Sequence, residues 1–187
     1  MPVAGADFRH EWAAREWGLD GSLAASRIAG SATSLIATQR SSARYYQRPD
    51  KENHRRDPTK TSLTGYLGEL TFAKLSGKHW TGTVTYQEYN PGFEINEVGF
   101  LGSTDMRSIA PLIAYRENTP SKYVRNWGQY LFWNPTWNFD GDMTFNGVGS
   151  ISVADRQQDV RIGRLRGRQA VLRDADHEAA DDVDDQD

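Results

Sequence analysis

The 187 residues can form one domain. The chain contains no cysteine, which excludes a disulfide framework and thiolate catalysis. The net charge of −3 hides an asymmetry, because residues 174–187 carry eight acids and neither Lys nor Arg. The bases elsewhere are interspersed with acids and form no dense patch, so the charge pattern argues against a nucleic-acid partner.

Hydropathy excludes one class of membrane protein and leaves another open. No apolar run approaches the ~20 residues of a transmembrane helix, and the mean hydropathy is −0.71. Transmembrane β-strands alternate lipid-facing and lumen-facing residues, so their hydropathy signal is weak. Residues 1–8 contain no basic segment followed by an apolar one, and no signal peptide is predicted at this N-terminus.

Alternation of apolar and polar residues predicts strands along most of the chain. Strands are predicted at residues 7–12, 17–26, 62–74, 79–89, 107–116, 124–134 and 145–153. Pro111 weakens the prediction for 107–116, because proline cannot donate a hydrogen bond to a ladder. One short helix is predicted at 31–38, with Ser31 as its N-cap.

The connections between these strands alternate between short and long. Residues 13–15, 76–78 and 117–122 are predicted short turns; residues 27–61 and 90–104 are long polar connections, and 138–142 contains an Asp-Gly turn. Gly77 and Gly92 are expected to supply positive φ in their turns. This alternation of length is typical of the meander of outer-membrane barrels.

The predicted fold class is all-β. We expect an antiparallel up-and-down meander of six to eight strands that forms an incomplete, open outer-membrane-type β-barrel, because too few strands are present to close a larger ring. The tryptophans and tyrosines lie mostly near strand ends, where an aromatic girdle is expected. A soluble β-sandwich or half-barrel with an aromatic core is the alternative.

Within the central hairpin, cross-strand pairing predicts one apolar face and one hydroxyl-amide face. The first face should contain Tyr66, Leu70, Phe72, Trp80, Val84 and Tyr86, and the second Thr81, Thr83, Thr85 and Gln87. The periodicity ends at Asp155. We therefore expect a partial barrel domain over residues 1–154 and a charged, disordered low-complexity tail over 155–187 that adds nothing to the sheet.

Four segments carry a resemblance to a known family: Gln39–Asp50, Asp57–Leu63, Asn90–Phe100 and Trp137–Asp142. The Pro-Gly-Phe-Glu sequence inside the third segment is the most specific. Together, within residues 6–153, they resemble a bacterial outer-membrane β-barrel domain of unknown function that usually follows a family-nine-type carbohydrate-binding module. The chain resembles an internal fragment of that domain.

The resemblance implies an antiparallel membrane barrel in the bacterial envelope, localised to the outer membrane and surrounded by its lipid. It also implies a role in handling glycans or peptides. It carries over no catalytic residue, and no cofactor is expected.

The candidate ligand-binding residues lie in the two long connections and the strand after them: Arg44, Tyr45, Tyr46, Arg48, Phe93, Glu94, Glu97 and Arg107. The tyrosines can stack on a sugar ring and the arginines can pair with an anion. Residues 90–100 are too apolar for a solvated loop, so we expect them to fold over the sheet, with Glu94 and Glu97 beside Arg44, Arg48 or Arg107. In the alternative interpretation, loop 43–61 only packs its own tyrosines.

No catalytic or metal site is predicted. The four histidines are scattered, and no pair has ligand spacing. Asp140-Gly141-Asp142 lacks the downstream Glu of a calcium loop, so turn chemistry explains it better. Glu94 and Glu97 are treated as solvated loop charges by default.

Three functions follow from these patterns. The leading hypothesis is a non-enzymatic, envelope-associated outer-membrane barrel fragment. The second is a soluble β-rich carbohydrate-binding domain that uses Trp and Tyr on a sheet face as its platform. A glycoside hydrolase acting through Glu94 or Glu97 is a distant third.

Overall fold

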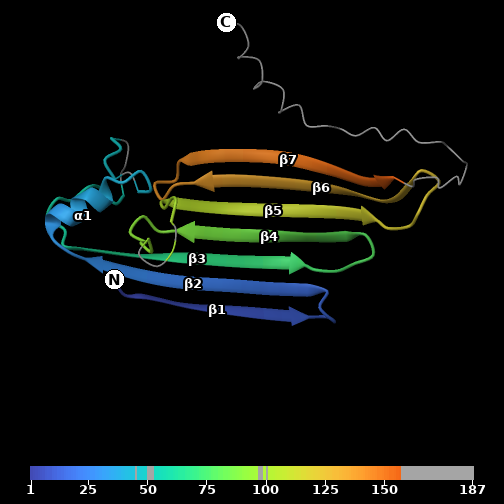
Figure 1. Ribbon diagram of the computed structural model, residues 1–187, viewed down its shortest axis with the longest axis horizontal. Coiled ribbons are helices and arrows are strands. Elements are labelled where there is room, and N and C mark those ends of the chain that lie inside the picture. Colours follow the sequence, from blue (N-terminus) through green and yellow to red (C-terminus); the bar gives the residue numbers. More distant parts are fainter. Residues whose placement is uncertain (45, 50–52, 97–98, 100, 157–187) are drawn as a thin grey trace, which may run out of the picture. The chain divides into compact units, whose positions relative to one another are not determined.

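The computed structural model describes residues 1–44, 46–49, 53–96, 99 and 101–156. Seven strands form one antiparallel sheet in chain order, with one short helix between the second and third strands (Figure 1). The elements are β1 (Val3–Trp12), β2 (Trp17–Ala29), α1 (Ala32–Gln39), β3 (Ser62–Lys74), β4 (Trp80–Tyr89), β5 (Met106–Glu117), β6 (Val124–Trp137) and β7 (Met143–Arg156). Each strand pairs with its neighbours in sequence, and β1 and β7 are the two edges.

The predicted all-β, open meander is confirmed, and seven strands fall within the expected six to eight. All seven predicted segments are strands, and α1 begins after Ser31, whose side chain accepts a hydrogen bond from Ser34 N. β1, β2, β5, β6 and β7 are longer than predicted, β3 has the predicted bounds, and β4 begins one residue later than predicted. β7 continues through Asp155 and Arg156, so the expectation that residues 155–187 add nothing to the sheet is wrong for these two residues. Residues 157–187 lie outside the described part of the chain.

The register gives the sheet two unlike faces, because residues directly opposite each other in antiparallel strands share a face. Leu70 pairs with Tyr86 and Phe72 with Val84, which confirms the predicted faces of the central hairpin. The apolar face carries Phe8, Trp12, Leu23, Leu70, Phe72, Trp80, Val84, Tyr86, Ile109, Ile113, Tyr115, Trp127, Leu131, Trp133 and Val148.

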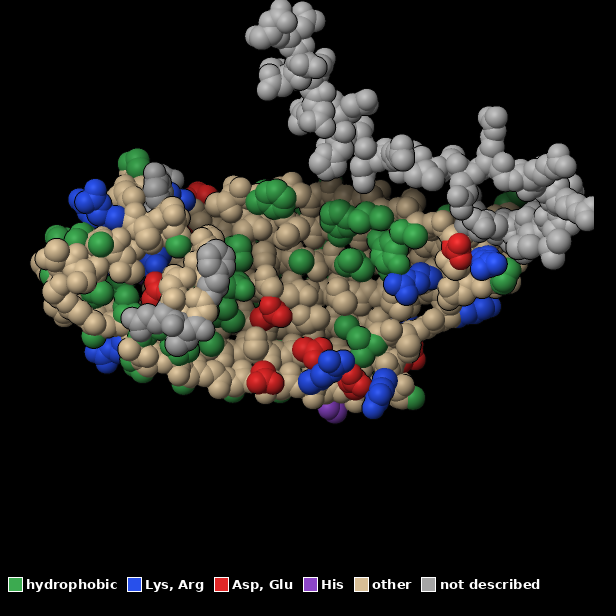
Figure 2. Space-filling model, viewed as in Figure 1, with side chains coloured by type: hydrophobic (Ala, Val, Ile, Leu, Met, Phe, Trp, Pro, Cys, Tyr) green, Lys and Arg blue, Asp and Glu red, His purple; other side chains and the backbone are tan. Residues whose placement is uncertain are grey.

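The polar face carries Asp7, Arg9, Asp20, Ser22, Ser26, Glu69, Thr71, Thr81, Thr83, Thr85, Gln87, Ser108, Arg116, Asn134 and Thr136. Figure 2 shows this face, with acidic side chains over its lower strands and green hydrophobic side chains over its upper strands. Phe132, Phe145, Ile151 and Val153 make the polar face apolar near β7. The two faces therefore contrast most sharply over β2–β5.

The small core lies at one end of the polar face. Leu35 of α1, Tyr46 and Leu63 of β3 form a buried cluster, and Ile28 packs against it. Among the described residues, no second layer covers the apolar face, and many of its large side chains are exposed. No helix in the described part of the chain is long and apolar enough to span a membrane.

Two of the predicted glycine conformations are wrong. Gly141 has a φ of +96° in the predicted Asp-Gly turn, but Gly77 and Gly92 are not among the residues with positive φ. Both are instead needed for close approach: a Cβ would lie 2.7 Å from Trp80 O at Gly77 and 2.2 Å from Thr64 O at Gly92. The predicted turn at 13–15 is made by three non-glycine residues with positive φ.

Pro111 is accommodated inside β5, opposite Val84 of β4. On the other side of β5, no pairs occur between Ser108↔Thr136 and Leu112↔Phe132. The ladder is therefore interrupted where Pro111 and Pro135 of β6 lie, two residues that have no N–H to donate.

Replacing Gly65 by Ala should release the connection between β4 and β5. A Cβ at this position would lie 2.0 Å from Phe93 N and 2.3 Å from Gly92 C, both backbone atoms that cannot move without displacing the loop. We expect limited proteolysis to cleave residues 90–104 faster, with stability lowered by roughly 2 kcal/mol. Gly68→Ala is the matched control on the same strand, because its Cβ would meet nothing closer than 3.8 Å. Equal cleavage of both variants would contradict this packing.

Candidate functional site

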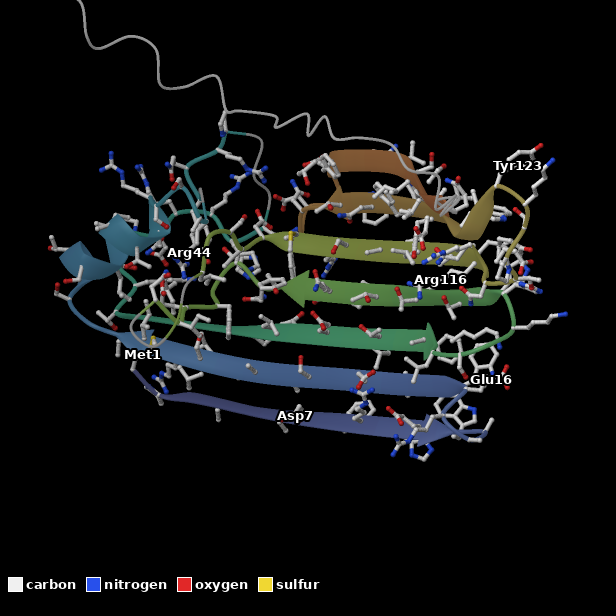
Figure 3. The ribbon with its side chains drawn as sticks, turned by 45° about the vertical axis from the view of Figure 1, so that its right-hand side comes forward. Met1, Asp7, Glu16, Arg44, Arg116 and Tyr123 are labelled. Carbon is white, nitrogen blue, oxygen red and sulfur yellow. The ribbon has the colours of Figure 1, made fainter. Side chains whose placement is uncertain are left out.

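Three connections gather at one end of the sheet. They join β2 to β3, β4 to β5, and β6 to β7, whereas the short turns lie at the opposite end (Figure 1). Figure 3 labels Arg44 among the long connections, and Glu16, Arg116 and Tyr123 near the short turns. The two predicted long connections are confirmed, but the β6–β7 connection at residues 138–142 is as short as the turn at 118–123. Because both long loops lie at this end of the sheet, their candidate residues can meet.

The β4–β5 connection folds over the polar face, as predicted. Phe93 is 1 % exposed, and Glu94 N donates a 2.8 Å hydrogen bond to Ser26 Oγ on the polar face of β2. The fold-back begins at Asn90, whose carbonyl accepts from Phe93 N and whose side chain accepts from Gly92 N. The loop is therefore a fixed part of the structure.

Arg44 holds this loop in place. It is 2 % exposed, and its Nη2 donates to Phe93 O at 2.5 Å and to Glu94 Oε2 at 2.6 Å. Its Nε has no hydrogen-bond partner among the described residues. The cost of desolvating a buried charge pair can exceed the Coulombic attraction between its charges. The main effect of this pair is therefore to fix the position of the loop.

Arg48 connects the other two loops. Its Nη2 lies 3.3 Å from Asp140 Oδ2 in the β6–β7 connection and 3.6 Å from Asp105 Oδ2 just before β5. Asp105 has a φ of 60° and accepts a 3.0 Å hydrogen bond from Phe139 N. One guanidinium thus links all three connections.

Tyr46 is the hydrophobic anchor of the β2–β3 connection. It is buried against Leu35 and Leu63, and its backbone N donates to Gln39 O. Burial raises the pKa of Tyr46 to about 12, against the opposing effect of the nearby Arg44 charge. Gln39 is also fully buried and exchanges two hydrogen bonds with the backbone of Asp57.

The structure brings five of the eight candidate residues to this cluster: Arg44, Tyr46, Arg48, Phe93 and Glu94. Arg107 belongs to the apolar face, where its Nε lies 3.5 Å from Glu88 Oε2, and its guanidinium lies over the Phe139 ring of the β6–β7 connection at 4.0 Å. Tyr45 and Glu97 lie outside the described residues.

Sequence reasoning missed Asp105 and Asp140 as partners of Arg48. Asp140 is explained by turn chemistry in the sequence, Asp105 falls between the predicted loop 90–104 and the predicted strand 107–116, and no local pattern connects either acid to a residue so far away in the chain. Ser26 and Gln39 were missed for the same reason, since their partners also lie far along the sequence.

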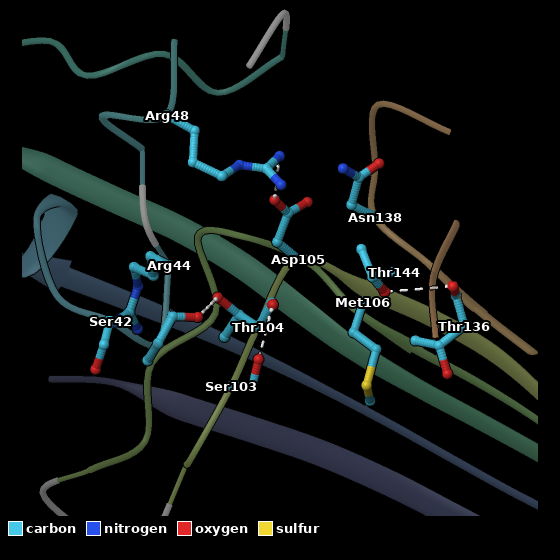
Figure 4. Close-up of a pocket in the computed structure, with 11 residues that line it drawn as sticks. Ser42, Arg44, Arg48, Ser103, Thr104, Asp105, Met106, Thr136, Asn138 and Thr144 are labelled. Carbon is cyan, nitrogen blue, oxygen red and sulfur yellow. Dashed lines mark hydrogen bonds and ion pairs between the residues drawn. The ribbon is translucent and has the colours of Figure 1, made fainter. Parts of the chain in front are cut away.

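The described residues of the cluster enclose cavities with mixed polar and apolar linings. One, of about 390 Å³, is lined by residues that include Ser41, Arg44, Glu94 and Asn96. Another, of about 210 Å³, touches all three connections and is shown in Figure 4. Among the described residues, no group of three or more His, Cys, Asp and Glu side chains is placed to hold a metal ion.

Comparison with known proteins adds one finding. The model of the family described as Domain of unknown function (DUF5916) matches residues 19–165, which is most of the chain. The match begins in β2 rather than at residue 6 and extends beyond Val153, where the resemblance drawn from sequence motifs ended. No curated protein and no solved structure matches the chain.

Replacing Arg44 by Met should destabilise the loop cluster. The variant leaves Glu94 buried without its cation, which typically costs about 3–5 kcal/mol. We expect a lower midpoint of unfolding and faster cleavage in residues 90–104. Adding Glu94→Gln should restore part of the loss. Arg40→Met, at an exposed position at the end of α1, is the control; a similar loss in both single variants would contradict the role of Arg44.

High pH should loosen the cluster through Tyr46. Since the pKa is raised from 10.0 to about 12, the stabilisation is complete below pH 10 and is lost as the pH rises towards 12. The loss should reach about 2–3 kcal/mol, measured as loop protection from proteolysis or hydrogen exchange. Tyr46→Phe should lack this dependence while other groups titrate normally. An identical pH profile in both proteins would refute the assignment.

Proposed function

Because the chain belongs to the family described as Domain of unknown function (DUF5916), whose description names no activity, we propose a function from the sheet itself. The protein is a non-enzymatic part of an outer-membrane β-barrel. Its apolar face contacts lipid, its polar face lines the lumen, and its loop cluster handles glycans or peptides that enter there. The observation that carries this proposal is the continuous, exposed apolar face.

The apolar face is so large and so exposed that its contact with water is unfavourable. In the middle of the strands, Leu70 and Val84 are each 46 % exposed, and Ile113 and Leu131 are each 53 % exposed. These residues lie on four neighbouring strands and form one aliphatic band. Contiguous exposed apolar surface of this kind marks a protein or membrane contact, and lipid chains fit a band without polar groups.

Aromatic rings border this band. Near the short turns, Trp17 stacks on Phe72 with ring centroids 5.3 Å apart, and Trp80 meets Tyr115 edge-on at 4.9 Å. Towards the loop end, Tyr66 and Tyr86 donate hydrogen bonds to Glu88. Two aromatic rows that flank an aliphatic band are the pattern of lipid-facing barrel surfaces.

The strand dimensions also support a barrel. The strands contain 10 to 14 residues, compared with the ~9–11 needed to cross a bilayer at a tilt. Since β1 and β7 run in the same direction, pairing them would be parallel. A fully antiparallel ring built on this sheet therefore requires an odd number of additional strands.

The polar face supports the lumenal assignment. Hydroxyl, amide and charged side chains line it, and the β4–β5 connection lies over it through Glu94 and Ser26. Glu94 is held by Arg44 and also accepts from Asn96 N. This arrangement suits a carboxylate that positions a loop, which favours a non-enzymatic role.

A soluble carbohydrate-binding domain would use the same aromatic rings as a platform. The rings favour that function only at the short-turn end, where they contact one another. The aliphatic band between the aromatic rows would serve no purpose in sugar binding. The membrane assignment accounts for both features.

Two adjacent substitutions test this proposal. Val84 and Thr83 occupy the middle of β4 on opposite faces. An arginine on a lipid-facing position near the bilayer centre costs about 2–4 kcal/mol, whereas the lumenal face tolerates charge. Val84→Arg should therefore lower the fraction of protein that folds into liposomes, measured by protease protection, and Thr83→Arg should not.

The wild-type protein should also require detergent or lipid to stay monodisperse. A monomer that is soluble without detergent would contradict the membrane assignment and favour the sandwich-type domain. Equal loss of insertion in both variants would also contradict it.

A further inference from the structure

We propose that the 210 Å³ cavity between the β2–β3, β4–β5 and β6–β7 connections is a binding site for one neutral sugar ring, either a free hexose or the end unit of an oligosaccharide. The inference rests on the proposed function, because it specifies what the loop cluster would bind. It favours a sugar over a peptide.

The cavity is assembled from three separate parts of the chain. Ser42 and Arg48 come from the β2–β3 connection, Asp105 from the residue before β5, and Thr136, Asn138 and Thr144 from the ends of β6 and β7 (Figure 4). Arg48 and Asp105 fix its walls by their ion pair, and Asn138 exchanges two hydrogen bonds with Asp142. The walls are therefore held in place without a ligand.

Five of the eleven lining residues carry a hydroxyl group, which can donate and accept a hydrogen bond: Ser42, Ser103, Thr104, Thr136 and Thr144. The Thr144 hydroxyl donates to Thr136 O, and the Thr104 hydroxyl donates to Ala43 O. The hydroxyl oxygens of Thr144 and Thr104 can each still accept a hydrogen bond. The hydroxyls of Ser42 and Thr136 make no hydrogen bond to the described residues, so each can both donate to a ligand and accept from it. Mixed donors and acceptors at close spacing match the hydroxyls of a sugar.

Charge balance argues against an anionic ligand. The two cavity arginines already face three carboxylates: Glu94 beside Arg44, and Asp105 and Asp140 beside Arg48. A phosphate or carboxylate would therefore have to compete with these ion pairs for the two arginines. The cavity volume is also below the ~300–1,000 Å³ of sites for drug-sized ligands, which suits a single ring better than a peptide.

The test uses the full chain in amine-oxide micelles, since detergents with sugar headgroups would compete. Saturation-transfer NMR and calorimetry would probe D-glucose, D-galactose, D-mannose, N-acetylglucosamine and maltotriose. Inorganic phosphate and trialanine are the alternative ligands. We expect at least one sugar to bind with a Kd of about 1 mM. Tighter binding of maltotriose than of D-glucose would identify an oligosaccharide end as the occupant, and the reverse would identify a free hexose.

Thr136→Val preserves shape and removes a hydroxyl, and Ser42→Ala changes an exposed position. Each should weaken sugar binding about tenfold, whereas Thr83→Val, on the polar face away from the cavity, should not. Loop proteolysis verifies that each variant keeps its fold. The proposal is overturned if no sugar binds, if phosphate or trialanine binds more tightly, or if Thr136→Val and Ser42→Ala bind as wild type does.

This outcome is separable from the membrane proposal. Thr136→Val should insert into liposomes normally, and Val84→Arg should still bind sugar in micelles. If no sugar binds but the protein inserts normally, the sugar-site proposal is refuted and the barrel proposal is not.

Discussion

The apolar face of β1–β7 has to be shielded from water, and no other layer of the described residues shields it. This constraint separates the two sides of the sheet. On one side, Leu70, Val84 and Ile113 point away from all other described elements. On the other side, α1 and the long connections pack at one end only, around Leu35, Tyr46 and Leu63. Burial by the chain itself is therefore concentrated in a small region, and the larger apolar surface depends on its surroundings.

Because the hydrophobic cluster is small, polar contacts position the loops. Arg44 fixes the β4–β5 connection through Phe93 O and Glu94, and Arg48 ties together Asp105 and Asp140. Buried pairs of this kind add little net stability, yet breaking one of them is costly. The same contacts leave cavities between the loops. The contacts of Arg44 and Arg48 therefore determine both the positions of the loops and the cavities between them.

The sequence was sufficient to predict the strands, their faces and the fold-back of residues 90–96, because each depends on local alternation or on a local excess of apolar residues. Trp80 and Thr81 had to lie on opposite faces once the strand was recognised. The partners of Arg48 could not be predicted, since Asp105 and Asp140 are brought to it only by the three-dimensional arrangement of the loops. Arg107 was misplaced because its register in β5 puts it opposite Glu88, on the apolar face. The roles of Gly77 and Gly92 were also missed, because close backbone approach leaves no trace in a single sequence.

The central claim is that lipid covers the apolar face, and site-directed spin labelling tests it most directly. The chain contains no cysteine, so single cysteines can be introduced along β4 without background labelling. In liposomes, nitroxides at residues 80, 82, 84 and 86 should be accessible to oxygen and shielded from a water-soluble nickel reagent. Labels at 81, 83, 85 and 87 should show the reverse, with a period of two residues. Equal accessibility on both faces, or a nickel-accessible label at residue 84, would contradict the account.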